Sequence, residues 1–255
     1  MARARQEGEL AKPMIPEQSF SSLLAGLYGP QRRSAIILLS SILLVVTWWH
    51  LGSPKFYLEH YSDRTAPWGE AAKVAPACAF LTTLVLLGVI PALIVKFVLR
   101  EKLADYGVGL GNRLRTVRSF VMVAPFLLLI AYLSSRSPAV VAEYPLNRVA
   151  GRSPADFGFH VATYLLLYLG WEFHFRGFLQ YGLRESVGDV PAILIQTMGS
   201  TLGHLGKSAA ETYAAVAAGL LFGVLAFRTR SLLSGLMLHT VLGVSLDYFI
   251  CFGPR

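Results

Sequence analysis

The chain has 255 residues, of which 54% are hydrophobic and only 15% are charged. A soluble globular domain has about 25% charged residues, so this composition excludes a typical soluble fold and indicates an integral membrane protein. The formal net charge is +8. Because the basic residues gather in the segments between apolar stretches, they need no nucleic-acid partner, and none is expected.

The apolar stretches predict the fold. About 20 apolar residues span the hydrocarbon core of a bilayer as a helix, and the sequence offers about seven such stretches. We therefore expect an all-α, polytopic membrane helix bundle with about seven transmembrane helices. In chain order, the expected spans are 34–51, 74–98, 117–133, 159–179, 190–205, 209–227 and 232–252.

The chain divides into three parts around these spans. Residues 1–33 are polar and are expected to form an N-terminal tail without a cleavable signal peptide. Residues 34–135 form a transmembrane scaffold with few polar candidates. Residues 157–252 hold the candidate site and follow a polar, proline-containing break. Basic residues are more frequent on the N-terminal side of the seven-span topology, so the N-terminus is expected in the cytoplasm.

The two cysteines indicate no further structural or functional site. Cys78 and Cys251 lie within or at the end of expected spans. Their number and spacing predict neither a disulfide framework nor a metal site.

Glu172 and Arg176 carry opposite charges within one of the most apolar stretches of the chain. Four residues apart, they lie on one face of a helix. An ionisable side chain in a membrane segment is costly unless it is paired and turned away from lipid, so it indicates a functional site. A buried ion pair that joins two helices is the structural alternative.

Two histidines on other expected spans complete a candidate site. His204 ends the fifth span, and His239 lies in the seventh, with Gly243 and Asp247 one and two turns further along the same face. An acid and two imidazoles can activate water and stabilise an oxyanion. The same donors can instead hold zinc with an open position for water. The signature H-E-x-x-H is absent, so no cofactor is predicted; a bound metal would take Glu172, His204 and His239 as ligands.

The sequence Glu172-Phe-His-Phe-Arg176-Gly177-Phe178, followed by His204 and His239, resembles the three-motif pattern of the CPBP family of intramembrane proteases. That family includes CAAX endopeptidases of the Rce1 type and bacterial proteins linked to bacteriocin processing or immunity. The resemblance covers about residues 164–247. It implies a membrane endopeptidase of glutamic or metallo mechanism that acts on a peptide or membrane-protein substrate. It further implies a multi-pass protein of the bacterial plasma (inner) membrane.

The resemblance also implies roles for single residues. Glu172 and His204 would activate water as the general base, and His239 would stabilise the oxyanion. Arg176 would position Glu172. Glu211, near the start of the sixth span, is expected to support the site or to interact with the positive end of its own helix.

Two positions depart from the family pattern. Trp171 stands where the first glutamate of the Glu-Glu-x-x-x-Arg motif belongs, and Gly243 stands at the asparagine position of the third motif. Because Gly243 has no side chain, Asp247 is expected to orient His239 instead. These departures favour an alternative, a non-catalytic protein that binds peptides or partner proteins, as in bacteriocin immunity. A transporter with a proton relay ranks last, because the sequence has no inverted repeat.

The seven-span topology constrains the position of the fifth apolar stretch. It places Glu172 near the middle of the membrane and His204 toward the outer end of a short helix. The fifth segment must therefore be displaced, tilted or partly re-entrant for the two side chains to meet. Of the remaining histidines, His174 is expected to pack between helices and His160 to lie at the membrane interface.

Overall fold

The computed structural model describes residues 21, 29, 31–65 and 69–254. All regular secondary structure in these residues is helical, which confirms the predicted all-α class. The tail predicted for residues 1–33 lies almost entirely outside them. The elements are α2 (Arg32–Leu51), α3 (Pro54–Thr65), α4 (Ala71–Thr83), η2 (Leu84–Val89), α5 (Ile90–Leu93), η3 (Ile94–Leu99), η4 (Leu103–Tyr106), α6 (Arg113–Ser134), α7 (Pro138–Glu143), η5 (Ala150–Arg152), α8 (Pro154–Glu172), η6 (Phe173–Tyr181), α9 (Gly182–Val187), α10 (Asp189–Leu202), α11 (Ala209–Thr229) and α12 (Leu233–Phe252).

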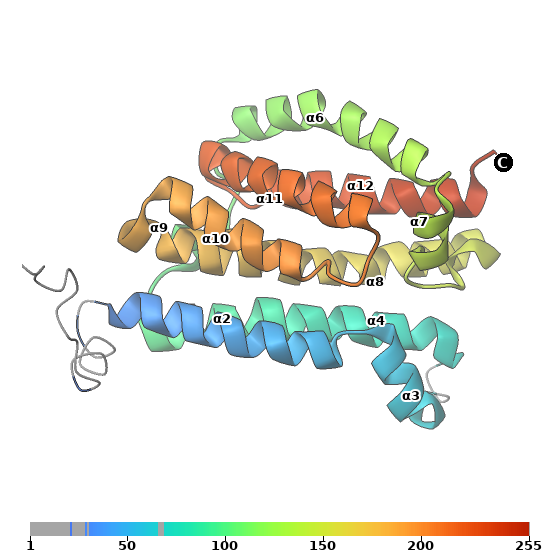
Figure 1. Ribbon diagram of the computed structural model, residues 1–255, viewed down its shortest axis with the longest axis horizontal. Coiled ribbons are helices and arrows are strands. Elements are labelled where there is room, and N and C mark those ends of the chain that lie inside the picture. Colours follow the sequence, from blue (N-terminus) through green and yellow to red (C-terminus); the bar gives the residue numbers. More distant parts are fainter. Residues whose placement is uncertain (1–20, 22–28, 30, 66–68, 255) are drawn as a thin grey trace, which may run out of the picture.

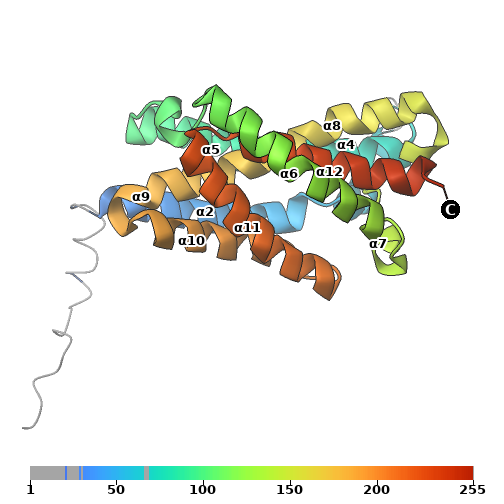
Figure 2. The same cartoon turned by 90° about the horizontal axis from the view of Figure 1, so that it is seen from above.

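The long helices lie side by side in one elongated bundle (Figures 1 and 2). α6 packs along α12, α10 packs along α11, and α4 packs along α8. The start of α2 and the C-terminus lie at opposite ends of the bundle (Figure 1). Helices from both halves of the chain therefore contribute to the same packed structure.

Among the described residues, five helices are long and apolar enough to cross a membrane, namely Arg32–Leu51, Ala71–Leu99, Arg113–Ser134, Ala209–Thr229 and Leu233–Phe252. The chain is a multi-pass membrane protein, but the predicted count of seven spans is not confirmed. The other two expected spans are helical and fall short for different reasons. α8 contains polar side chains that lower its hydropathy, and α10 has only 14 residues. At 1.5 Å per residue, α10 is roughly 21 Å long and shorter than the hydrocarbon core.

The central element of the bundle is the continuous helical segment formed by α8, η6 and α9. Within it, every residue from 170 to 180 is buried. A helix that is buried on all sides can carry charged side chains without exposing them to lipid. Its middle part, η6, has π-helical geometry, which occurs often at functional sites.

Hydroxyl caps fix where two of these helices begin. Ser153 Oγ accepts a hydrogen bond from the backbone N–H of Asp156 at 3.1 Å, and Pro154 occupies the first turn of α8. Ser208 Oγ accepts one from the backbone N–H of Glu211 at 3.2 Å at the start of α11. Such caps satisfy N–H groups that a helix start leaves without partners.

A glycine allows α8 to cross the helix formed by α4 and η2. A Cβ added to Gly170 would lie 2.6 Å from the carbonyl oxygen of Thr83 and 2.9 Å from the Cα of Leu84. Both atoms belong to the backbone and cannot turn away. Close approach through small residues is the usual way in which membrane helices pack tightly.

We expect Gly170→Ala to lower the free energy of unfolding by about 1–3 kcal/mol, because the new methyl group forces two backbones apart. Thermal unfolding of the detergent-purified protein measures the loss. Gly158→Ala is the matched control on the same helix, because a Cβ at Gly158 meets nothing within 4 Å. Equal effects of the two substitutions would show that the crossing is not tightly packed.

Candidate active site

Polar and small side chains of α8 and α12 face each other along a line that we call the α8–α12 seam. Two hydrogen-bonded pairs show that the helices run antiparallel, since the pairing advances along α8 while it moves back along α12. On both helices the seam residues recur every four positions, which keeps them on one face. They are His160, Tyr164, Tyr168, Glu172 and, on η6, Arg176, opposite Gly235, His239, Gly243 and Asp247.

Glu172 is the buried acid of the seam, with 2% of its surface exposed. Its Oε1 accepts a hydrogen bond from Nδ1 of His239 at 2.9 Å and lies 3.3 Å from Nη1 of Arg176. The ion pair predicted from the sequence is thus formed within one helical segment, and His239 joins it from α12. The second oxygen, Oε2, has no hydrogen-bond partner among the described residues. It packs against Gly235, where an added Cβ would lie 2.6 Å away.

The contact with Glu172 fixes the protonation pattern of His239. A carboxylate only accepts hydrogen bonds, so Nδ1 carries the proton and Nε2 keeps its lone pair. The ring packs between Tyr168 and Phe222, with centroid distances of 4.6 and 5.6 Å. Its side chain is 19% exposed, whereas that of Glu172 is 2% exposed. Nε2 of His239 makes no hydrogen bond with a described residue.

His204 approaches the pair from the end of α10. Because α10 is short, the turn after it lies beside Trp171, the neighbour of Glu172 in sequence. The two rings are perpendicular, with centroids 5.5 Å apart. His204 Nδ1 donates a hydrogen bond to the carbonyl oxygen of Ser200 at 2.8 Å, which leaves the lone pair on Nε2. The short fifth helix thus places His204 beside the neighbour of Glu172, and a direct meeting of the two side chains stays a prediction.

His204 lies in a turn outside the candidate spans, and its surroundings keep it neutral. Burial lowers its pKa to about 4, and the charges of Lys207 and His239 act in the same direction. The hydrogen bond to Ser200 and the charge of Glu211 oppose this shift only in part. An ordinary histidine has a pKa of about 6.5. At neutral pH, His204 is therefore an uncharged hydrogen-bond acceptor at Nε2.

Trp171 fills the position beside this histidine with an apolar ring. It is buried and packs on Trp48 and Phe175 at centroid distances of 5.2 and 4.6 Å. A Cβ added to Gly203 would lie 2.5 Å from the indole. The structure thus has an aromatic support for His204 where the family pattern has its first glutamate.

Asp247 does not orient His239, and that prediction is wrong. Its Oδ2 accepts a hydrogen bond from Nε2 of His160 at 2.7 Å, and both side chains are fully buried. Asp247 is two turns from His239, roughly 12 Å along the helix, so its carboxylate meets a different part of α8. His160 is thus buried between α8 and α12, and its predicted position at the membrane interface stays a prediction.

Tyr168 is a seam residue that the sequence motifs do not single out. A Cβ added to Gly243 would overlap its hydroxyl oxygen. The glycine therefore makes room for a polar group of another helix next to His239. The only signal in the sequence is the four-residue spacing from Glu172, which places Tyr168 on the same helix face.

Glu211 belongs to a polar cluster beside the His204 turn and does not contact Glu172. It accepts a hydrogen bond from the Tyr144 hydroxyl at 2.6 Å and lies 3.1 Å from Lys207 Nζ. Lys207 also donates to Tyr144. Thr212 Oγ1, one helical position after Glu211, donates to the carbonyl oxygen of His204 at 3.2 Å. The cluster therefore fixes the turn that presents His204.

The described residues do not fit the alternative of a zinc site. No group of three His, Cys, Asp or Glu side chains among them has the arrangement of a metal site. His174 stays outside the site, buried against Phe175 and Phe178.

The segment that contains these residues also matches a known protein family. Residues 154–244 match the family model described as type II CAAX prenyl endopeptidase Rce1-like. The match confirms the resemblance to the CPBP family over this segment, which is similar to a family of intramembrane CAAX-type proteases. It includes Glu172, Arg176, His204 and His239 and ends before Asp247. No curated protein and no solved structure matches the chain.

We expect Gly243→Ala to lower the free energy of unfolding by about 1–3 kcal/mol, because the added methyl group collides with the Tyr168 hydroxyl. Tyr168→Phe removes that oxygen, so the double variant should recover much of the loss. Thermal unfolding of the four proteins forms a double-mutant cycle. Strictly additive effects would contradict the contact.

We expect His204 to stay neutral at a pH between about 4 and 6.5, where an ordinary histidine becomes charged. The folded state then binds fewer protons there than the unfolded state, so His204 contributes stability that is lost as pH falls through this window. Nitrogen NMR of histidine-labelled protein measures its protonation, and His204→Gln assigns the signal. An imidazolium signal for His204 in this window would contradict the expectation.

Proposed function

We propose that the protein is an intramembrane endopeptidase that hydrolyses a peptide bond of a membrane-associated substrate, with Glu172 and His239 as an acid–histidine pair. The hydrogen bond between Glu172 Oε1 and His239 Nδ1 carries the proposal. It joins two motif residues that are far apart in the sequence and leaves Nε2 of His239 as a base. The family match of the segment supports the reaction class.

In the proposed reaction, Nε2 of His239 removes a proton from water as the water oxygen attacks the peptide carbonyl carbon. Glu172 stabilises the imidazolium that forms, as a buried carboxylate does in an acid–histidine pair. The imidazolium then gives the proton to the leaving amine, which restores the neutral ring. Arg176 favours the ionised form of Glu172 by its charge.

His204 has a second role in this scheme. Its neutral Nε2 accepts a hydrogen bond from the same water and orients it. The sequence alone led to a different division, with Glu172 and His204 as the base and His239 as the oxyanion donor. The contacts favour His239 as the base, because Glu172 already holds its ring by Nδ1. No step of the scheme passes through a metal.

The second candidate function is peptide or partner binding without hydrolysis. The observation that favours it is Trp171, whose indole stands where the family pattern places a water-activating carboxylate. In that case the Glu172–His239 pair stabilises the seam, and the neighbouring surface binds a peptide that is not cleaved. Both functions act on membrane-associated peptides, so one experiment separates them.

We expect Glu172→Gln to lower the cleavage rate by about 100-fold or more, because an amide cannot stabilise the imidazolium of His239. The protein is reconstituted in liposomes with two probes, a farnesylated peptide ending in a CAAX sequence and a membrane-anchored peptide library without a prenyl group. Mass spectrometry detects the cleaved peptides.

Asp247→Asn is the matched control, because it alters a buried carboxylate of the same seam that contacts His160 and not His239. We expect it to lower thermal stability more than the cleavage rate of the folded protein. Equal cleavage by wild-type protein and folded Glu172→Gln would exclude the proposed mechanism. Binding of a probe without cleavage by the wild type would favour the second candidate.

A further inference from the structure

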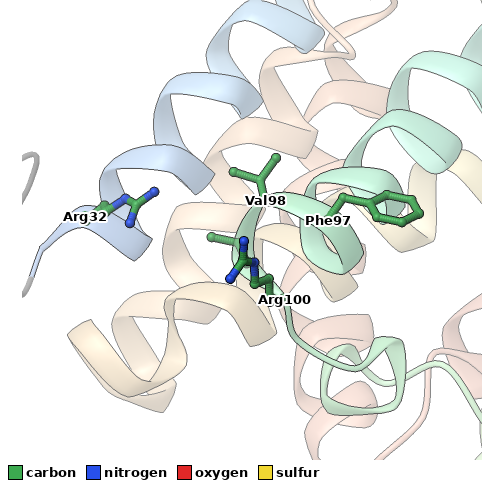
Figure 3. Close-up of a pocket in the computed structure, with 5 residues that line it drawn as sticks. Arg32, Phe97, Val98 and Arg100 are labelled. Carbon is green, nitrogen blue, oxygen red and sulfur yellow. The ribbon is translucent and has the colours of Figure 1, made fainter.

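A basic cavity lies between the start of α2 and the end of η3, on elements that contribute no residue to the seam. It has a volume of 490 Å³ and is lined by Arg32 and by residues 97–100 (Figure 3). The Arg32 guanidinium extends from α2 toward the helix end that carries Val98 and Arg100 (Figure 3). A second cavity of 250 Å³ shares Arg32, Val98 and Leu99 with it.

The acid that lines the second cavity, Glu101, is already engaged. Glu101 accepts two hydrogen bonds from Arg33, at 2.7 and 3.1 Å, and one from the Tyr106 hydroxyl at 2.5 Å. Burial raises the pKa of Glu101, but the hydrogen bonds from Arg33 and Tyr106 lower it further, so it lies below its ordinary value. Glu101 is thus an ionised partner of Arg33, and a bidentate contact of this kind is strong.

Arg32 and Arg100 have no such partner. Within the described part of the chain, neither guanidinium makes a hydrogen bond or an ion pair. Arg100 also adopts a left-handed backbone conformation, with φ of 61°, where glycine is the favoured residue. Arg100 directly follows the last turn of the candidate span Ala71–Leu99.

The rest of the lining is apolar and belongs to a candidate span. Phe97 and Val98 are 64% and 50% exposed and lie in the span Ala71–Leu99. Two guanidinium groups without a partner among the described residues therefore adjoin exposed hydrocarbon at one end of the bundle. A phosphodiester with acyl chains has both properties, since its charge suits the arginines and its chains suit the apolar face. Basic pockets at the ends of membrane helices bind lipid headgroups in this way.

We propose that the cavity between α2 and η3 binds the phosphodiester headgroup of an anionic membrane lipid through Arg32 and Arg100. The acyl chains lie along Phe97 and Val98. The proposal does not depend on the proposed hydrolysis, because the cavity uses none of the seam residues. Arg33 and Glu101 pair with each other in the lining of the second cavity, so this acid is already occupied.

The test uses the full chain in neutral detergent, titrated with short-chain phosphatidylglycerol or with phosphatidylcholine of the same chain length. Native mass spectrometry counts bound lipids. We expect phosphatidylglycerol to bind more tightly, and the double substitution Arg32→Gln/Arg100→Gln to weaken its binding by about 30-fold, as expected for two lost charges near a membrane surface. Binding of phosphatidylcholine should not change.

The matched control is Arg113→Gln/Arg118→Gln, which removes two exposed arginines from the start of α6. The start of α6 lies at the same end of the bundle, beside the end of α11, since Asn112 N–H donates to the carbonyl oxygen of Thr229. Unchanged binding by the control supports the site. Equal weakening by both double variants, or no weakening by Arg32→Gln/Arg100→Gln, overturns it. Displacement of the lipid by inorganic phosphate at similar concentration also overturns it, because the site would then take free phosphate.

Discussion

A carboxylate in the apolar interior of a membrane bundle is stable only with partners of opposite charge or with hydrogen-bond donors, and Glu172 has both. Arg176 supplies the charge from the next turn of the same helical segment, and His239 supplies the donor from α12. The first partner comes with the helix itself. The second requires α12 to lie against α8 in one register, so the position of the whole C-terminal helix is tied to this contact.

Small residues allow α8 and α12 to pack together in that register. Gly235 leaves space for the second oxygen of Glu172, and Gly243 leaves space for the Tyr168 hydroxyl. On α8, Gly170 lets that helix approach α4 and η2 at backbone distance. Since hydrocarbon gives no driving force for burying apolar surface between helices, such close packing and polar contacts determine how these helices associate.

The replacement of a family glutamate by Trp171 changes the chemistry that the site can perform. One carboxylate remains, Glu172, and its hydrogen bond holds the ring of His239. In the proposed mechanism the base is accordingly an imidazole. The indole in turn supports the ring of His204, which a charged side chain at that position would not do by packing. Trp171 and the positions of His204 and His239 are thus consistent with one another.

The sequence by itself determined the all-α class, the membrane location and the motif residues Glu172, Arg176, His204 and His239, because hydropathy and local spacing are properties of short segments. Only the tertiary structure determined which side chain each of these polar residues contacts. Asp247 and His239 share a helix face, yet Asp247 meets His160, because α8 and α12 cross antiparallel and each turn faces a different residue. The span count also depended on tertiary context, since a buried central helix needs less hydropathy than a lipid-facing one. Contacts between distant segments depend on register and depth, which no local pattern encodes.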